Sequence, residues 1–320
     1  MAKNYRTNLI VSSAPHIVTD YDTTRLMGTV LLALLPSLIA STYIFGARVL
    51  LLSAVCVVAS VVFEWLYNII TKKTQTIGDL SAAVTGLLIA FNVPSSFPLW
   101  MAAIGCFFAI VVVKQLYGGI GKNFVNPAIA ARIFLFISFA GNMSSWPIAR
   151  ISETADAVTG PTPLGIFAEG NVDQLPDLLN MFLGFHGGST GEVCSLALLI
   201  GGLFLIWKKV ISPIIPVAFL GTVFVMGAIF GGNGLQGGVF HVLAGGAMLG
   251  AFFMATDYVT SPKLKSGQIM FGIGCGLVTM IIRLWGSYPE GVSFAILLMN
   301  ICVPLFNKLS YKFYLKGGAK

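Results

Sequence analysis

The chain has 320 residues, of which 56% are hydrophobic and only 10% are charged. Soluble domains carry about 45–50% apolar and about 25% charged residues, so the composition excludes a water-soluble globule and indicates an integral membrane protein. The net charge of +7 is spread over separate loops, which makes nucleic-acid binding a poor explanation for it.

Apolar stretches of about the length that crosses a membrane recur along the whole chain. A helix needs roughly 20 apolar residues to span a hydrocarbon core of about 30 Å. The predicted fold is therefore all-α, a polytopic membrane protein with about ten transmembrane helices, of which the third is short. They lie near residues 27–45, 49–70, 80–93, 97–114, 125–140, 193–207, 212–230, 238–255, 267–285 and 293–309.

The positive charges predict the orientation of the chain, because Lys and Arg near helix ends accumulate in cytoplasmic loops. With ten spans and a cytoplasmic N-terminus, nearly all of these cations, Lys114 among them, fall on the inside. The outside segments keep only Arg48, Arg150 and Arg283. This predicts a multi-pass protein of the cell (inner) membrane with both termini cytoplasmic, and no cleavable signal peptide is evident.

This topology divides the chain into five parts. A cytoplasmic segment, 1–26, precedes a first five-helix repeat, 27–140. An outer-side loop, 141–192, holds half of the chain's 12 acidic residues. A second five-helix repeat, 193–310, and a cytoplasmic tail, 311–320, complete the chain.

A short sequence pattern supports the two repeats. Residues 101–106 recur as 270–275, and Lys114 and Arg283 stand eight residues beyond the Cys that ends each copy. A weaker pairing relates 86–92 to 250–256. Five crossings separate the matched helices, so the two repeats are inverted; chance similarity between apolar segments is the alternative.

Helix interruptions occupy corresponding places in the two repeats, at residues 92–98 and 257–262. Asn126 and Pro127 add a third break, inside the fifth helix, because Pro removes a backbone hydrogen bond. Inverted repeats commonly place binding sites near the membrane midplane, where broken helices meet. The sequence therefore predicts a central cofactor or ion site.

Ionisable groups inside lipid are costly and usually face a cavity or a partner. Glu64 is either such a group or a snorkelling residue at the interface, and Asp257, beside a helix end, either binds a cation or caps. Acids within or beside the helices are few, these two and Asp79, which argues against a long proton path through this chain. Other polar residues of interest are Asn92, Asn126, Arg132 and Arg283.

The five cysteines lie in or beside apolar helices without CxxC spacing, so we expect them to be structural, and we predict no metal ligands. An iron–sulfur cluster within the chain needs grouped thiolates, although a single Cys at a helix end leaves open a cluster shared with a partner. His16, His186 and His241 are too scattered to indicate a bis-His haem site.

One polar loop, 156–164, stands out between the two blocks of helices. Gly160 and Thr162 each precede a proline, which pushes them out of the α region into extended conformations. We expect Thr162 on a stiff ribbon incompatible with a helix, with its hydroxyl presented and not buried. An ordinary turn is the plain alternative.

The same loop resembles the flavinylation motif of the RnfD and NqrB family, Asp-x-x-Thr-Gly-x-Thr followed by Pro-Leu, in which the last Thr carries FMN through a phosphoester. This chain has Pro161 where the family has Ala, which stiffens the segment that a flavin transferase must grip. Residues 14–17, 123–128 and 254–262 also resemble the family, and the chain length is closer to RnfD.

The resemblance implies a membrane electron-carrier subunit of an ion-translocating ferredoxin:NAD oxidoreductase, the Rnf complex, coupled to Na+ or H+ transport. FMN would be attached to Thr162 on the outer side, and riboflavin or a second flavin would bind without a covalent bond. Without a dinucleotide-binding motif, the chain would be part of a translocase-type oxidoreductase but not catalytically complete alone, with no catalytic residues of its own. The implied partners are an outer-side FMN protein, cytoplasmic ferredoxin- and NAD-binding subunits, and a flavin transferase.

The candidate cofactor-binding residues combine the motif with the polar groups of the helices. Arg132 either pairs with an acid for structure or steadies a flavin phosphate or reduced flavin with its positive charge. The full candidate set is Asp156, Thr159, Gly160, Thr162, Asn126, Arg132 and Asp257.

Two other classes of function fit parts of the pattern. Inverted halves with paired broken helices are also typical of small-solute channels and transporters, and fold alone does not decide function. A structural anchor for partner subunits is the third possibility. Bound flavin separates them, because only the electron carrier requires a yellow protein.

Overall fold

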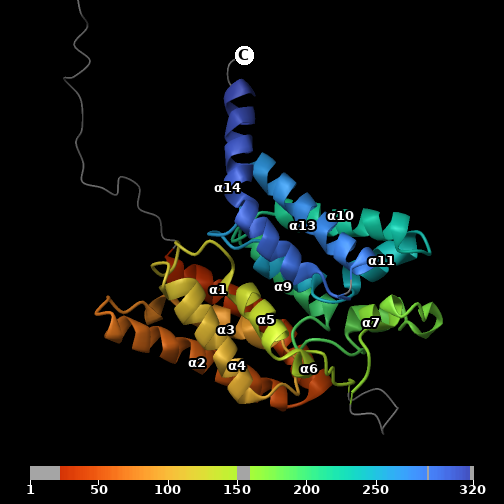
Figure 1. The fold of residues 1–320 in the computed structure, drawn as a ribbon, viewed down its shortest axis with the longest axis horizontal. Helices are drawn as coiled ribbons and strands as arrows, with labels where there is room; N and C mark the ends of the chain where they lie inside the picture. Colours follow the sequence, from red (N-terminus) through yellow and green to blue (C-terminus); the bar gives the residue numbers. More distant parts are fainter. Residues whose placement is uncertain (1–21, 150–158, 287, 318–320) are drawn as a thin grey trace, which may run out of the picture.

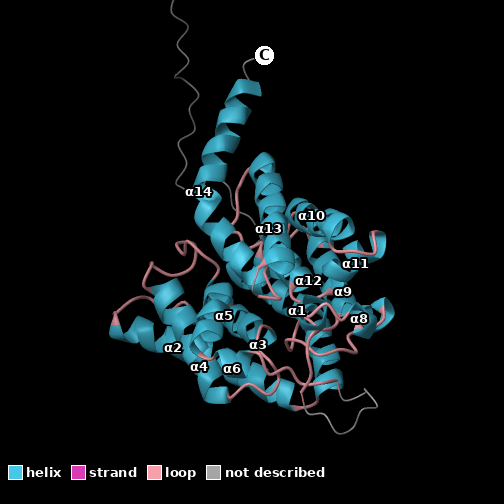
Figure 2. Ribbon diagram, turned by 45° about the vertical axis from the view of Figure 1, so that its right-hand side comes forward, coloured by secondary structure: helices cyan, strands magenta, loops and turns pink. Residues whose placement is uncertain are grey.

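The computed structural model describes residues 22–149, 159–286 and 288–317. Throughout these ranges the chain is built from helices (Figures 1 and 2), and the one β-like contact is an isolated antiparallel bridge between Pro147 and Thr159. The all-α prediction is confirmed for this part of the protein. Asp156, the resemblance at residues 14–17, and most of segment 1–26 lie outside the described residues.

Each of the ten predicted stretches contains a helix. In the first half these are α1 (Thr23–Phe45), α2 (Arg48–Ile70), α3 (Ser81–Phe91), α4 (Leu99–Phe107) with its π-helical continuation η2 (Phe108–Gln115), and α5 (Pro127–Ser138). In the second half they are α9 (Ser195–Trp207), α10 (Ile214–Phe230), α11 (Leu235–Leu243), α12 (Ala247–Leu249) with the π-helical η4 (Gly250–Met254), α13 (Lys265–Trp285) and α14 (Val292–Gly317). Short helices fill the connections: η1 (Ile77–Asp79), α6 (Ala140–Met143), α7 (Pro163–Ala168), η3 (Val172–Gln174) and α8 (Leu178–Leu183).

Four helices of the described chain are long and apolar enough to cross a membrane: α1, α2, α13 and residues Val292–Lys312 of α14. The pair α11 and Ala247–Met254, bent by 70°, makes a fifth if it is one broken span. The other apolar helices are shorter, at 10–17 residues. Multiple membrane crossings are therefore supported, while the ten-span inverted arrangement stays a prediction.

The break at residues 92–98 is confirmed, since it separates α3 from α4. The guanidinium of Arg48 stabilises this turn by donating to the carbonyl oxygens of Ser95 at 2.9 Å and Ser96 at 3.1 Å. A charged donor thus holds the turn between α3 and α4 by binding two of its backbone oxygens.

The predicted break inside the fifth helix is wrong. α5 begins at Pro127, and the Asn126 side chain caps it by accepting from the N–H groups of Ala128 at 3.0 Å and Ile129 at 3.3 Å. Asn is a favoured cap and Pro a favoured first helical residue, so this dipeptide starts a helix instead of interrupting one.

The sequence did not predict the 70° bend between α11 and α12. Gly245 takes a φ of 59° there, a left-handed conformation that glycine adopts without steric cost. The predicted helix 238–255 is therefore two pieces joined at a corner.

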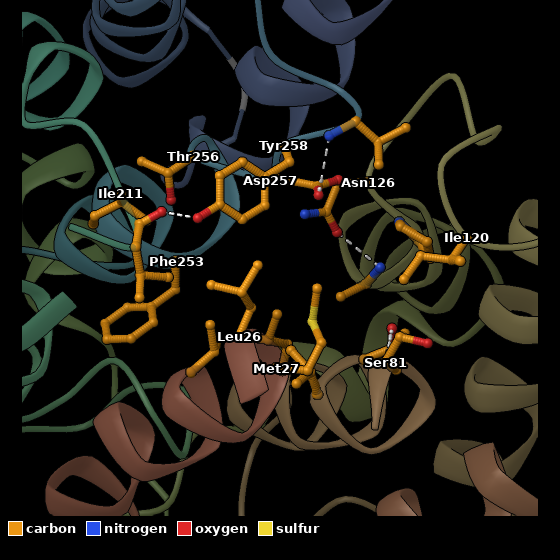
Figure 3. Close-up of a pocket in the computed structure, with 18 of the residues that line it drawn as sticks. Leu26, Met27, Ser81, Ile120, Asn126, Ile211, Phe253, Thr256, Asp257 and Tyr258 are labelled. Atoms are coloured by element: carbon orange, nitrogen blue, oxygen red, sulfur yellow. Dashed lines mark hydrogen bonds between the residues drawn. The ribbon is translucent and has the colours of Figure 1, made fainter. Parts of the chain in front are cut away.

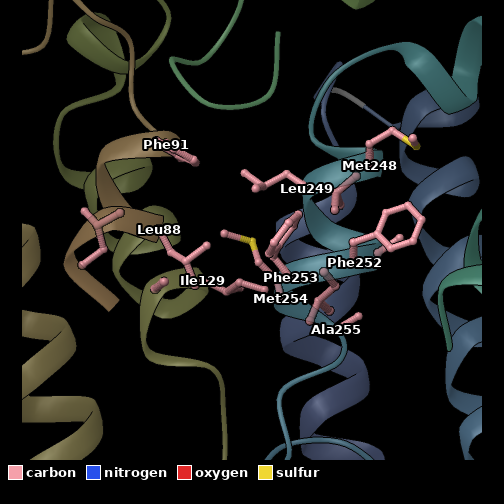
Figure 4. Close-up of a cluster of buried hydrophobic side chains, with 14 of the residues drawn as sticks. Leu88, Phe91, Ile129, Met248, Leu249, Phe252, Phe253, Met254 and Ala255 are labelled. Atoms are coloured by element: carbon pink, nitrogen blue, oxygen red, sulfur yellow. The ribbon is translucent and has the colours of Figure 1, made fainter. Parts of the chain in front are cut away.

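The two half-helices α3 and α12–η4 meet at the centre of the molecule. Every residue of α3 is buried, and α12 and η4 are buried along their full lengths. Figure 4 shows Leu88 and Phe91 of α3 with Ile129 of α5 facing Leu249, Phe253 and Met254 of the opposite half. This apolar contact joins segments that lie far apart in the sequence.

The surrounding helices pack in a similar way in each half. α2 packs on α3 and α4, and α10 packs on α11 and α13, while α1 against α9 links the halves. Figure 1 shows α1–α6 on one side, α10, α11 and α13 on the other, and the end of α14 projecting beyond them.

The α1–α9 contact requires a glycine. A Cβ atom at Gly201 would lie 2.1 Å from the Ala33 carbonyl oxygen, whereas one at Gly221, in α10, would meet nothing within 4 Å. We expect Gly201→Ala to lower the free energy of unfolding by about 1–3 kcal/mol through overpacking. Thermal unfolding in detergent measures it, with Gly221→Ala as the control; equal melting temperatures for the two variants would contradict this packing.

Candidate functional site

Thr162 lies at the start of α7 and caps it. Its backbone is extended, with φ −73° and ψ 159°, as the following proline predicts. Its Oγ1 accepts from the N–H of Gly165 at 3.1 Å. The expected exposed hydroxyl is wrong, since Thr162 is 5% exposed, because capping draws the side chain onto the helix that the predicted ribbon did not include.

Thr162 nevertheless borders open space, because it lines a cavity of about 530 Å³. The cavity lies where the start of α7 meets α5 and the loop that precedes α14. Its walls are Arg132, Ile133, Phe136, Ile137, Ala140, Ser144, Trp146, Pro161, Thr162, Gly165, Tyr288, Pro289, Glu290, Ser293 and Phe294. We refer to it as the Thr162 cavity.

Aromatic rings form one wall of the Thr162 cavity. The ring of Tyr288 stacks on Phe294 with centroids 5.7 Å apart and an interplanar angle of 19°. Phe136 meets Tyr288 edge-on at 5.4 Å. Tyr288 is 49% exposed, so an aromatic surface remains available to a ligand that enters the cavity.

Arg132 contributes the positive charge of this cavity and holds several segments together. Its Nη1 donates to Asn92 Oδ1 at 3.0 Å and lies 3.7 Å from Glu192 Oε2, and its Nη2 pairs with Glu290. The predicted pairing of Arg132 with an acid is confirmed. The same residue also lines the Thr162 cavity, so a cofactor role remains compatible with this pairing.

The structure adds two acids to Glu64, Asp257 and Asp79, the acids that the sequence placed within or beside the helices: Glu192 is buried, and Glu290, just before α14, is partly exposed. Glu192, assigned to the outer loop, is 2% exposed. The segment around it folds back onto the end of α3, where the N–H groups of Thr190 and Gly191 donate to carbonyls of the 91–93 turn at 3.0 Å. Sequence position alone gave no signal for this reversal.

Asn126 and Asp257 line a different cavity, of about 240 Å³, between α1, α3, α5 and η4. Figure 3 shows Asn126, Asp257 and Tyr258 above an apolar floor that includes Leu26 and Met27. Asn126 also donates to the Met254 carbonyl oxygen at 3.2 Å. We refer to this space as the Asn126 cavity.

Asp257 caps its own turn. One carboxylate oxygen accepts from the Val259 N–H at 3.4 Å and the other from Thr260 Oγ1 at 2.9 Å. Of the two alternatives that the sequence left open, capping is therefore observed.

The structure thus divides the predicted set between two places. Thr162 and Arg132 share the first cavity, and Asn126 and Asp257 share the second. Thr159 and Gly160 precede Thr162, and the Gly160 N–H donates to the Trp146 carbonyl oxygen at 3.0 Å, which holds this strand of the loop beside residues 146–147.

Lys114 and Glu64 form a buried ion pair at the edge of the Asn126 cavity. Lys114 Nζ lies 2.9 Å from Glu64 Oε2 and donates to Ser81 Oγ at 2.6 Å. Glu64 is 0% exposed, so the snorkelling alternative is wrong. Lys114, predicted at the cytoplasmic end of its helix, lies in the last turn of η2 and is 3% exposed because it pairs with this acid. Its side of the membrane stays a prediction.

Arg283, the counterpart of Lys114 in the proposed repeat, is also buried. It was predicted to end its helix on the outer side; it lies in the last turn of α13, is 4% exposed and donates to the carbonyls of His241 at 2.6 Å and Ala244 at 2.9 Å. These oxygens belong to the end of α11, which attracts cations.

The described cysteines are free, and no group of three or more His, Cys, Asp or Glu within the described ranges is arranged to hold a metal ion.

Comparison with known proteins identifies the family. The model of the NQR2, RnfD, RnfE family matches residues 10–314. The chain belongs to this family. It is 47% identical to a subunit of the Na(+)-translocating ferredoxin:NAD(+) oxidoreductase complex of Acetobacterium woodii, over 95% of this chain and 94% of the relative.

Other relatives of this family member carry related names. A subunit of the proton-translocating ferredoxin:NAD(+) oxidoreductase complex of Clostridium ljungdahlii is 42% identical, over 94% of each chain. A subunit of the ion-translocating oxidoreductase complex of Stutzerimonas stutzeri is 38% identical, over 89% of this chain and 90% of the relative. These relatives are subunits of oxidoreductases that move ions.

The Lys114–Glu64 pair makes a testable contribution to stability in this family member. Glu64→Gln leaves a buried ammonium without its counter-ion, and we expect a loss of about 3–5 kcal/mol. The double variant Glu64→Gln/Lys114→Met removes both charges and should recover most of that loss. Thermal unfolding of the two variants in detergent measures the coupling; additive losses would contradict it.

Proposed function

We propose that this chain is a membrane electron-carrier subunit of an ion-translocating ferredoxin:NAD oxidoreductase, with FMN joined to Thr162 by a phosphoester. The family membership and the names of the relatives support the complex. The observation that carries the flavin assignment is the position of Thr162 on the wall of a cavity that also contains a buried guanidinium and stacked aromatic rings.

The residues of the Thr162 cavity fit a flavin in size and chemistry. Its volume of about 530 Å³ falls within the roughly 300–1,000 Å³ of small-molecule sites. Tyr288 and Phe136 offer apolar faces to a planar ring, and Arg132 offers a cation to a phosphate or to negative charge on a reduced ring. Bound flavin supplies the electron-transfer chemistry, and the protein supplies position and electrostatics.

Because Thr162 is buried, a covalent bond at its Oγ1 would also fix the position of the flavin. An ester at Oγ1 keeps an oxygen that accepts the N–H of Gly165, so the cap of α7 survives attachment. The neighbouring Pro161 and Pro163 restrict the backbone on both sides, which holds the attachment point still relative to the aromatic wall. A tethered flavin also cannot escape from a site on the outer face.

The Asn126 cavity is our candidate for a second flavin, bound without a covalent bond. Its volume of about 240 Å³ is below the range of most small-molecule sites. The cavity therefore suits the flavin ring system, with the side chain of the flavin outside the enclosed space. Asn126 offers an amide, Thr256 a hydroxyl, and Asp257 a carboxylate at the rim, while Leu26 and Met27 supply apolar contact.

In this proposal the chain passes electrons across the membrane between an outer-side FMN protein and cytoplasmic ferredoxin- and NAD-binding subunits. The relatives include one named for sodium and one named for proton translocation, so the moved ion is Na+ or H+. A flavin transferase would attach the FMN on the outer side. The solute-transporter alternative requires no flavin in either cavity.

Removal of the Thr162 hydroxyl tests the covalent assignment. We expect Thr162→Ala to lose all covalent flavin, seen as loss of ultraviolet-excited fluorescence from the band in a denaturing gel and of the added mass on the peptide that contains residue 162. Ser144→Ala is the matched control, because Ser144 lines the same cavity and its hydroxyl donates to the Ala140 carbonyl in its own turn. A fluorescent Thr162→Ala band would refute the assignment.

Substitution in the Asn126 cavity tests the second flavin separately. Asn126→Asp keeps the oxygen that caps α5, since Asp caps as well as Asn, but it replaces the amide donor with a negative charge. We expect the flavin released by denaturation to fall several-fold, while covalent flavin at Thr162 is unchanged and serves as the internal control. Unaltered release would argue against this cavity as the second site.

A further inference from the structure

We infer that Glu290 is a redox-linked proton acceptor: its carboxylate takes up a proton from water on the cavity side when an electron is added to the group in the Thr162 cavity. This inference rests on the proposed function. It assigns a role to a residue that the sequence analysis did not single out.

Glu290 is the one acidic residue among the described residues that line the Thr162 cavity. It lies in the loop between α13 and α14 and shares the cavity wall with Thr162 and Arg132. Its side chain is 21% exposed, whereas that of Glu192, on the other side of the same guanidinium, is 2% exposed. Of these two acids, only Glu290 both lines the cavity and keeps part of its side chain exposed.

The charges around Glu290 are balanced before reduction. Arg132 approaches from α5, Arg283 from α13 beside Gly245, and Glu192 from the segment before α9. Two cations and two carboxylates therefore share a buried region. An added electron makes this region net negative, and proton uptake by a carboxylate is the response that restores the balance.

Burial raises the pKa of Glu290 to about 7, against the lowering effect of Arg132. A carboxyl with such a pKa changes its protonation readily when one charge is added nearby. The step is balanced: the electron comes from the outer-side flavoprotein donor of the proposed function, the proton comes from water, and Glu290 passes from carboxylate to carboxylic acid. Arg132 keeps its contacts with Asn92 and Glu192.

The charge of Glu290 determines how the midpoint potential of the flavin depends on pH. Above pH 7 the ionised Glu290 opposes the added electron and lowers the midpoint potential, and reduction draws in a proton. Well below pH 7 the residue is already neutral and has no such effect. A neutral amide at this position should therefore raise the potential at high pH and leave it unchanged at low pH.

The experiment is a redox titration of the covalent flavin in the purified complex, from well below to well above pH 7, for the native chain and Glu290→Gln. We expect the two curves to coincide at low pH and to separate as the pH rises, with the variant higher. Glu290→Asp keeps a titratable group and should keep the native pH dependence. Glu169→Gln, at an exposed acid after α7, is the control and should follow the native curve.

Parallel curves over the whole pH range would overturn the inference while leaving the flavin assignment intact. A native protein without covalent flavin would overturn the proposed function and this inference with it. If Glu290→Gln fails to insert because Arg132 loses its partner, the charge-balanced Arg132→Gln/Glu290→Gln variant replaces it. Its potential should show no bend near pH 7, and a native-like bend would count against Glu290.

Discussion

The contacts of one buried guanidinium organise the centre of this protein. Arg132 joins α5, the end of α3, the segment before α9 and the loop before α14 through Asn92, Glu192 and Glu290. A charge in a membrane interior is tolerated only when partners replace its hydration, so these four segments must assemble together. The Thr162 cavity forms at the outer edge of this assembly because Arg132 and Glu290 are also part of its wall.

The two halves solve a similar electrostatic problem with different partners. In the first half Lys114 is neutralised by Glu64 and reaches Ser81, the first residue of α3. In the second half Arg283 binds the carbonyls at the end of α11, just before α12 begins. Each cation thus stabilises the chain where a central half-helix starts, one with an acid and the other with backbone oxygens.

Sequence reasoning predicted the features that depend on local composition. The apolar stretches indicated a helix in every expected region, and the prolines around residue 162 indicated extended backbone there. It failed where distant segments decide the outcome. Nothing near Glu192 or Glu290 in the sequence indicates that Arg132 will pair with them. The prediction of an exposed Thr162 hydroxyl did not include the short helix that Thr162 caps. The ten-span topology, its orientation and the flavin sites remain predictions.

Two helix boundaries depend on local residues more than on apolar length. Asn126-Pro127 does not break a helix, although the sequence analysis predicts a break, because Asn followed by Pro favours a helix start. Gly245-Gly246 was placed within a continuous helix, although the pair allows the 70° corner between α11 and α12. In both places the residues that begin and end helices, and not the length of the apolar stretch, decide where the helix lies.

The glycine at position 246 has a consequence beyond backbone geometry. A methyl group there would lie 2.5 Å from Glu192 Oε2 and 3.4 Å from Arg132 Nη1. The backbone of this residue is ordinary, with φ −74°, so even alanine would act as a wedge between two opposite charges instead of distorting the chain. The absence of a side chain at this single point leaves room for the acid beside the guanidinium, so the small size of Gly246 favours the ion pair between Glu192 and Arg132.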